Sequence, residues 1–363
     1  MKLIIEPTDG VAPILSAIRS AKKSIEIAIF RFDRKDVESA LIAAAAKGVR
    51  VTALIAFANR GGEQSLRKLE LRFLDAGIVV ARTANDLSRY HDKYMVIDRR
   101  VLCLLSTNFT RIDIDHSRGF GIVTNRADWV REARRLFRAD CSRTKYASRS
   151  ETFVVSPANA RKTLGTFLQR AKKELLIYDP QISDIEMIRV LQERENAGVV
   201  IHVIGTVAGR TRLDAQKLGS MRLHTRTIIR DRRQAFIGSQ SLRAPELDSR
   251  RELGLIIQDA KAVTKLIETF EADWDPKQSR TAQADKEKAT MASEKQSEKA
   301  VEVLTKEMSP IVDTVKDAVK KAVAKAGEEV LDDKDIKDAM KKVVKKAVKD
   351  AVHDAVQETR EAS

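Results

Sequence analysis

Two short segments of the chain place a histidine and a cation two residues apart. One is His91–Lys93 and the other is His224–Arg226. In a β-strand, residues i and i+2 lie on the same face, so we expect the histidine and the cation of each segment to point the same way. Imidazole can attack phosphorus and can also protonate a leaving oxygen, while cations hold the non-bridging oxygens. Two such half-sites facing each other would cleave a phosphodiester without a metal.

Short polar residues follow both segments at the same distance. The first serine lies 15 residues after the histidine in each case, as Ser106 and as Ser239. Ser106 and Asn108 share one face of the strand expected to return after a turn at Asp98. Hydroxyl and amide donors of this kind can hold an oxygen on which negative charge develops.

These motifs lie at matching points of an internal repeat. The triplet Ala-Lys-Lys begins at Ala21 and again at Ala171, an offset of 150, and the turn glycines Gly48 and Gly198 keep that offset. The histidine segments are offset by 133, so the second repeat is shorter between these landmarks (150−133=17), which we expect to be a loop difference. Each repeat is predicted to run strand, helix, strand, helix, hairpin and closing strand-helix, which indicates an α/β sandwich.

The pattern His-x-Lys-x4-Asp followed by a Gly-Ser-x-Asn-like segment resembles the phospholipase D superfamily, over about Met1 to Trp274. The resemblance implies two α/β sandwich repeats packed as a pseudo-dimer and a covalent phosphohistidine mechanism. His91 would be the nucleophile and His224 the general acid. The residues that would bind the phosphoryl group are Lys93, Arg226, Asn108, Ser106, Ser239 and Ser241. Asp98 and Asp231 fall on the opposite strand face and are expected to brace the hairpins.

Both half-sites depart from the family pattern, the second more than the first. Arg226 stands where the family has lysine, Ser241 where it has asparagine, and Leu105 of the first half-site where it has glycine. The resemblance also implies a downstream acid that orients a histidine, and Glu252 fits that role. Its counterpart at offset 133 is Gly119, which carries no acid. If the acids act across the repeats, His91 keeps its partner and His224 loses one, with Asp113 or Asp115 as substitutes.

Composition limits the class of protein further. The chain has 363 residues and a formal charge of +15. From position 281 onward there are 17 basic and 18 acidic side chains, so positions 1–280 hold 67−17=50 basic and 52−18=34 acidic side chains, a charge of +16. A basic globular part suits a polyanionic partner. With two cysteines, and with no signal peptide or membrane span apparent in the sequence, the cytoplasm is the expected compartment.

We predict repeats at 1–147 and 148–276, a linker at 277–300 and a helical tail at 301–363. The tail has apolar residues at helical spacing and is expected to contact an anionic membrane or to self-associate, against the alternative of a solvated Ala/Lys helix. His116, His202 and His353 lack metal-ligand spacing, and no cofactor or metal is expected.

The leading hypothesis from the sequence is a metal-independent phosphodiesterase that hydrolyses or transfers phosphatidyl groups. An endonuclease on the same scaffold is the first alternative, favoured by the charge of +16 on positions 1–280. A catalytically impaired protein that binds phosphodiesters or membranes is the second alternative.

Overall fold

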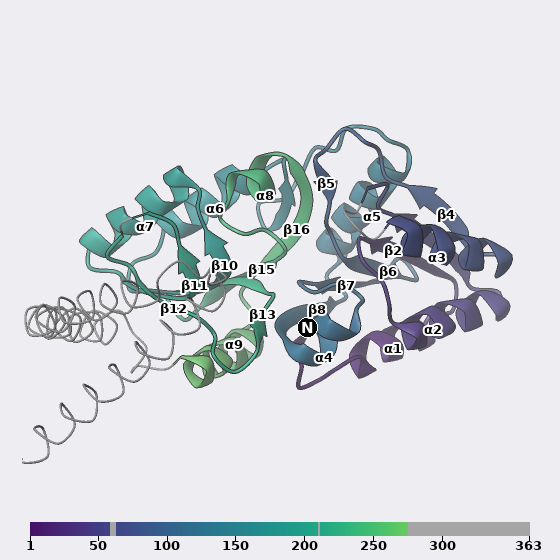
Figure 1. Cartoon of the computed structure of the whole chain (residues 1–363), viewed down its shortest axis with the longest axis horizontal. Helices are drawn as coiled ribbons and strands as arrows, with labels where there is room; N and C mark the ends of the chain where they lie inside the picture. Colours follow the sequence, from purple (N-terminus) through teal and green to yellow (C-terminus); the bar gives the residue numbers. More distant parts are fainter. Residues whose placement is uncertain (59–62, 210, 275–363) are drawn as a thin grey trace, which may run out of the picture. The chain divides into compact units, whose positions relative to one another are not determined.

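The computed structural model describes residues 1–58, 63–209 and 211–274. Each repeat forms one mixed β-sheet with helices, as shown in purple to blue and in teal to green in Figure 1. The helices of the first repeat are α1 (Ala12–Arg19), α2 (Lys35–Ala46), α3 (Glu63–Asp75), α4 (Arg111–His116) and α5 (Ala127–Cys141). Those of the second are α6 (Ala160–Gln169), α7 (Ile185–Asn196), α8 (Ala244–Asp248) and α9 (Ala260–Asp273). The prediction of two α/β sandwich repeats packed as a pseudo-dimer is confirmed.

The two sheets have the same strand order. The first runs β1 (Lys2–Glu6), β8 (Ser117–Thr124), β7 (Val101–Leu105), β6 (Tyr94–Ile97), β2 (Ser24–Ile29), β3 (Arg50–Ile55) and β4 (Val79–Arg82). In the equivalent direction, the second runs β9 (Phe153–Ser156), β16 (Arg250–Ile257), β15 (Gln234–Gly238), β14 (Arg226–Arg230), β10 (Glu174–Ile182), β11 (Val200–Val207) and β12 (Asp214–Gln216).

Each sheet also takes one short strand from the other repeat. Strand β5 (Arg89–Tyr90) pairs in parallel with β16, and β13 (Arg222–Leu223) pairs in parallel with β8. Figure 1 shows β5 beside β16 and β13 beside β8. Because each repeat completes the sheet of the other, the residues that follow these two strands are delivered to the boundary between the repeats.

Local sequence signals account for the shared helix-to-strand turns. Gly48 and Gly198 follow the ends of α2 and α7, and each has a φ of 85°. Only glycine adopts this left-handed conformation without strain, which ends the helix and starts the next strand. The prediction did not include strands β4 and β12, and it treated the length difference between the repeats as a loop. That was wrong, because the longer first repeat contains helix α3, which spans 13 residues.

A shared apolar core joins the repeats. It includes Trp129 of α5 and Phe120 of β8 from the first repeat, and Tyr178 of β10 and Leu255 of β16 from the second. The rings of Phe120 and Tyr178 meet edge to face with centroids 5.5 Å apart. Burial of large apolar side chains from both sides stabilises the pseudo-dimer as one body.

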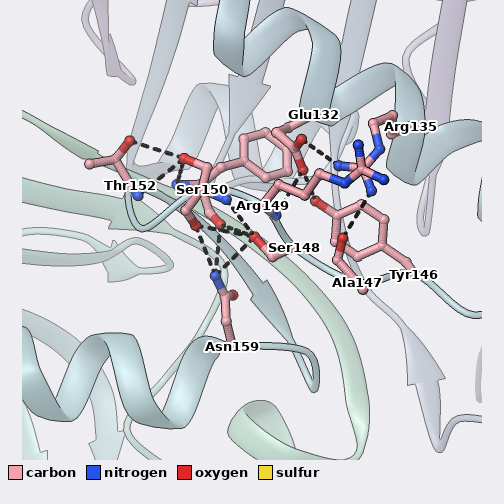
Figure 2. Close-up of polar contacts among 10 residues, drawn as sticks. Glu132, Arg135, Tyr146, Ala147, Ser148, Arg149, Ser150, Thr152 and Asn159 are labelled. Atoms are coloured by element: carbon pink, nitrogen blue, oxygen red, sulfur yellow. Dashed lines mark hydrogen bonds and ion pairs between the residues drawn. The ribbon is translucent and has the colours of Figure 1, made fainter.

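The connection between the repeats is held by polar contacts. Residues 144–150 contain no helix or strand. Figure 2 shows the Tyr146 hydroxyl donating to Glu132 of α5 at 2.6 Å, and Asn159 donating to the Ser148 hydroxyl at 3.1 Å. The boundary between 147 and 148 stays a prediction. The predicted linker at 277–300 and the predicted tail at 301–363 lie outside the described residues.

No helix in the described parts of the chain has the length and apolar character needed to cross a membrane.

The two hairpin aspartates hold the start of a neighbouring strand. Asp98 accepts backbone hydrogen bonds from Lys22, Lys23 and Ser24 at 2.9, 2.6 and 2.9 Å. Asp231 accepts the equivalent bonds from Lys172, Lys173 and Glu174 at 3.0, 2.7 and 3.1 Å. Both aspartates sit in a turn at positive φ, 51° and 52°. Their side chains thus tie each β-hairpin to the loop before the central strand.

We expect Asp98→Ala to lower the free energy of unfolding by about 2–3 kcal/mol, because three backbone donors lose a charged acceptor. Burial would raise the pKa of Asp98, but the three N–H donors hold it below its ordinary value. The stabilisation is therefore present above the ordinary pKa of an unfolded aspartate and is lost as the pH falls through the lower, folded value. Urea unfolding at pH 7 and pH 3 measures this; an equal penalty at both would contradict it.

Candidate active site

Both histidine segments lie where the chain passes from one sheet to the other. Residues 91–93 connect β5, which belongs to the second sheet, with β6 of the first sheet. His224 and Thr225 likewise connect β13 with β14. The prediction that His91 and Lys93 belong to one regular strand was therefore wrong. The crossing places both segments at the boundary of the repeats, which the strand geometry alone did not indicate.

His91 is fixed by an acid from the other repeat. Its Nδ1 lies 2.8 Å from Oε2 of Glu252 on β16, and its backbone N–H donates to the carbonyl of Arg251 at 2.7 Å. Both side chains are buried, with Glu252 wholly inaccessible to solvent. An acid on Nδ1 sets the tautomer that leaves the Nε2 lone pair open for attack.

The two cations occupy equivalent positions in the two half-sites. Lys93 donates from Nζ to the His91 carbonyl at 2.5 Å, and Arg226 donates from Nη1 to the His224 carbonyl at 2.5 Å. Arg226 also donates from Nε to the Ser241 hydroxyl at 3.1 Å. The arginine thus keeps the contact that the lysine makes, and its second donor engages the serine found in place of asparagine.

The charges of the two half-sites act on each other. Burial lowers the pKa of His91 well below its ordinary value, and Lys93 and Arg226 lower it further. Burial likewise lowers the pKa of His224, which Arg226 and Lys93 also depress, while Asp113 opposes them. The cation of each repeat therefore lowers the pKa of the histidine of the other repeat, and both histidines are neutral in the free protein near pH 7.

Burial also moves the pKa of the remaining charged groups. It lowers the pKa of Lys93 to about 7, against the opposing effect of Glu252. It raises the pKa of Glu252 to about 7, against the opposing effect of Lys93. Such strongly shifted values, in groups that face one another across a domain boundary, are typical of functional sites.

His224 meets an acid through a different atom. Its Nε2 lies 3.5 Å from Oδ2 of Asp113 in α4, and its buried Nδ1 has no hydrogen-bond partner in the described part of the chain. Asp113 also accepts from Asn108 at 2.6 Å and from Arg222. Asp115 pairs with Arg34 instead, at 2.6 Å. Of the two suggested substitutes, Asp113 is therefore the one that lies beside His224.

The short polar residues hold the frame of the site. The Ser106 hydroxyl oxygen accepts from the Phe120 N–H at 2.9 Å, and the Ser239 hydroxyl oxygen accepts from the Leu253 N–H at 3.2 Å. Both serines are buried. Ser106 thus binds the end of its hairpin to β8, which carries Gly119. Ser239 binds the end of its hairpin to β16, which carries Glu252. In the free protein their acceptor sites are thus engaged by the backbone.

Sequence reasoning missed a pair of symmetric salt bridges behind the site. Arg251 donates to Asp140 of α5 at 2.9 Å, and Arg118 donates to Asp273 of α9 at 2.6 Å. Each pair joins the two repeats, and the two pairs are counterparts of each other, because both the arginines and the aspartates are offset by 133 (251−118 and 273−140). That shared offset was the signal that could have found them.

Phe30 was also missed. Its ring lies against His91 with centroids 4.6 Å apart, and the Lys93 Nζ lies 5.6 Å from its centroid. The aromatic face excludes water from one side of the first half-site and gives the lysine a cation–π contact. A phenylalanine at the end of an apolar strand gives no sequence signal of such a role.

The described residues hold no group of three or more His, Cys, Asp or Glu side chains arranged to bind a metal ion.

Two mixed sheets that exchange strands around a histidine from each repeat define a two-repeat phospholipase D-like protein. The family model described as "Cardiolipin synthase, PLD-like domain" matches residues 14–141 and 164–274. Since these two stretches cover more than half of the sequence, the chain belongs to that family. The match includes both His91 and His224.

Solved structures have the same fold. Polyphosphate kinase from Porphyromonas gingivalis is 21% identical with a TM-score of 0.64, over 74% of this chain and 49% of the kinase. This chain therefore spans about half of that protein. Phosphatidylserine synthase from Haemophilus influenzae Rd KW20 is 11% identical with a TM-score of 0.57, over 77% of this chain and 86% of the synthase. No curated protein sequence matches this chain.

Proposed function

We propose that this protein is a metal-independent phosphodiesterase that hydrolyses or transfers phosphatidyl groups through a phosphohistidine intermediate. The observation that supports this most is the contact between His91 Nδ1 and Glu252 across the repeats, at 2.8 Å. It leaves a neutral, oriented imidazole beside the buried cation Lys93. The matched family, described by its cardiolipin synthase members, favours a phosphatidyl substrate.

The proposed first step forms a bond between His91 Nε2 and phosphorus, using the nitrogen lone pair. The bond between phosphorus and the leaving oxygen breaks, and His224 gives that oxygen a proton. Lys93 and Arg226 hold the non-bridging oxygens as charge builds on them. A bound phosphodiester anion also offsets the two cations that depress the pKa of His224, which favours its protonated form before the leaving group departs.

The second step releases His91. His224, now neutral, takes a proton from water or from an acceptor alcohol, whose oxygen attacks phosphorus as the phosphorus–nitrogen bond breaks. Water yields a phosphomonoester, and an alcohol yields a new phosphodiester. The choice between hydrolysis and transfer depends on which oxygen nucleophile reaches the site, and both use the same residues.

An endonuclease is the second candidate, and a specific observation favours it. Positions 1–280 carry a charge of +16, and a basic surface raises the affinity for a nucleic acid backbone. The histidines and cations recognise only the phosphodiester group, which lipids and nucleic acids share.

The substrate is tested by incubating the full chain in EDTA with vesicles of phosphatidylglycerol and phosphatidylethanolamine, and separately with DNA. We expect EDTA-resistant release of the lipid headgroup, or its exchange with an added alcohol, and intact DNA. DNA cleavage with unchanged lipid would assign the endonuclease instead. Binding of either substrate without turnover would contradict the enzyme and leave a binding protein with an impaired second half-site.

A further inference from the structure

Two buried groups near the second half-site lack hydrogen-bond partners. Neither carboxyl oxygen of Glu6 has a partner in hydrogen-bond geometry within the described part of the chain, although the Thr107 hydroxyl is near enough to lower its pKa. Nδ1 of His224 has no hydrogen-bond partner there either. Glu6 is wholly inaccessible to solvent and His224 is 6% exposed. A buried carboxyl without partners is costly, so its presence calls for a functional reason.

Strand register makes Glu6 the neighbour of the missing acid. On the edge of the first sheet, Glu6 of β1 faces Gly119 of β8. At the equivalent place in the second sheet, Ser156 of β9 faces Glu252 of β16. Each pair thus contains one glutamate and one small residue, but the glutamate stands on the opposite strand of the pair in the first repeat.

His224 lies beside the pair Glu6–Gly119 in the way that His91 lies beside the pair Ser156–Glu252. The His224 N–H donates to the Arg118 carbonyl at 3.1 Å, just as the His91 N–H donates to the Arg251 carbonyl. Position 119 therefore lies beside His224 as position 252 lies beside His91. The guanidinium of Arg118 also donates to the Glu6 carbonyl at 3.0 Å, which fixes the backbone of β1 against this point.

The Glu6 carboxyl fills the space that a side chain at position 119 would take. A Cβ added to Gly119 would lie 2.2 Å from Oε2 of Glu6 and 2.3 Å from Cγ2 of Thr107. In the second repeat, the Cβ at this place begins the side chain that reaches His91. The Glu6 carboxyl is therefore on the face of β8 that is equivalent to the face from which Glu252 acts.

Asp113 does not serve Nδ1. It lies 3.5 Å from Nε2, the other ring nitrogen of His224, and it is already bound to Asn108 and Arg222. Its counterpart at offset 133 is Glu246, which pairs with Arg250 at 2.5 Å rather than with His91. The ring nitrogen equivalent to the one that Glu252 holds in His91 is thus left for another group.

We propose that Glu6 is the positioning residue of His224, acting from β1 in place of the acid that Gly119 lacks. It reaches Nδ1 by rotation about its side-chain bonds or through one ordered water molecule. The proposal rests on the proposed function in giving His224 the role of general acid. On this proposal the second half-site still has an orienting acid, but the acid lies on β1 and not on β8.

The charge state of Glu6 is consistent with this. Burial raises the pKa of Glu6 to about 8, partly countered by the nearby Thr107 hydroxyl, with Asp113, Asp115 and Asp9 raising it further. When protonated, such a carboxyl can still accept a hydrogen bond from Nδ1–H through its carbonyl oxygen, and as a carboxylate it would stabilise a charged His224 ring.

The first test reads the His224 tautomer in full-length protein labelled with 15N-histidine, using long-range nitrogen–proton NMR at pH 7. We expect Nδ1 to carry the proton in the wild type, and the proton to move to Nε2, facing Asp113, in Glu6→Leu. Leucine removes the unpaired buried carboxyl, so the variant is expected to fold. Ser156→Ala, at the matched position beside Glu252, should leave the His224 signals unchanged. An identical His224 tautomer in wild type and Glu6→Leu would overturn the proposal.

The second test uses turnover and a rescue. Glu6→Leu and Glu6→Gln are expected to lower kcat by roughly 10- to 100-fold with little change in KM, as for loss of an orienting partner. The rescue is made in a Thr107→Ser background, because this change removes the methyl group that a side chain at position 119 would meet. In that background Glu6→Ser should lose turnover. Adding Gly119→Glu to it should recover most of the turnover. Unchanged turnover in Glu6→Leu, or no rescue by Gly119→Glu, would overturn the proposal. If the wild type itself turns over no phosphodiester, the proposed function fails, and the NMR result alone decides the role of Glu6.

Discussion

Replacement of His91 by alanine is expected to lower phosphodiester turnover by at least about 10⁴-fold, as for loss of a nucleophile in other enzymes with covalent catalysis. The loss should appear in kcat, because Lys93 and Arg226 still hold the phosphate. The measurement is turnover in EDTA of whichever substrate the wild type cleaves.

A matched histidine outside the site controls for this variant. His202 of β11 stacks on Trp274 with ring centroids 4.5 Å apart, and its Nε2 lies 4.0 Å from Asp214. We expect His202→Ala to retain wild-type turnover within about 2-fold, as for substitutions away from the reacting groups. Substantial turnover by His91→Ala would mean that the bond to phosphorus forms elsewhere.

Glu252→Gln is expected to have the second largest effect, a loss of about 10²- to 10³-fold in kcat, since the amide no longer stabilises a positively charged His91 ring. The pH dependence should change as well. The buried Lys93, with a pKa lowered to about 7 by burial, is supported in its charged form chiefly by Glu252. Without that negative charge its pKa falls further, so Lys93 loses its proton at a lower pH. Activity that requires the charged lysine should therefore decline at a lower pH in the variant.

The control for Glu252→Gln is another buried carboxyl. Glu132 accepts hydrogen bonds from Arg135 and Tyr146 at the junction of the repeats. Glu132→Gln is expected to change stability without moving the pH profile of kcat. A profile that is identical in wild type and Glu252→Gln would show that the glutamate does not act on the charge of Lys93.

Much of the fold could be predicted because a feature that occurs in one repeat can be looked for at the equivalent position of the other. The glycines after α2 and α7 and the hairpin aspartates recur at fixed offsets, and each has a local physical reason that the structure displays. The order of elements within each repeat was predicted less well. Strand β4 and helix α3 depend on which segments pack on the growing sheet, which periodicity over a short window does not determine.

The site was predictable in its residues but not in its connections. His91, Lys93, His224 and Arg226 could be named because imidazole and cation spacing has chemical meaning. That residues 91–93 leave the strand and cross between sheets could not be inferred, since β5 is only two residues long and pairs with the other repeat. Glu6 was missed for a related reason. Its role depends on a cross-strand neighbour more than a hundred positions away, and nothing local distinguishes it from a strand-end glutamate.

The central claim is that one covalent bond to phosphorus forms on His91 and that His224 is needed to break it. The direct measurement is to mix His224→Asn with bis(p-nitrophenyl) phosphate, whose nitrophenolate leaves without a proton from His224, so that only the second step needs this residue. The reaction is quenched in alkali, the protein is digested and the added mass is located by mass spectrometry. We predict a phosphorus-containing adduct that accumulates on His91 and is absent from His91→Ala. An adduct on His224 or another residue in the wild type, or substrate consumption by His224→Asn with no adduct at any point, would contradict the account.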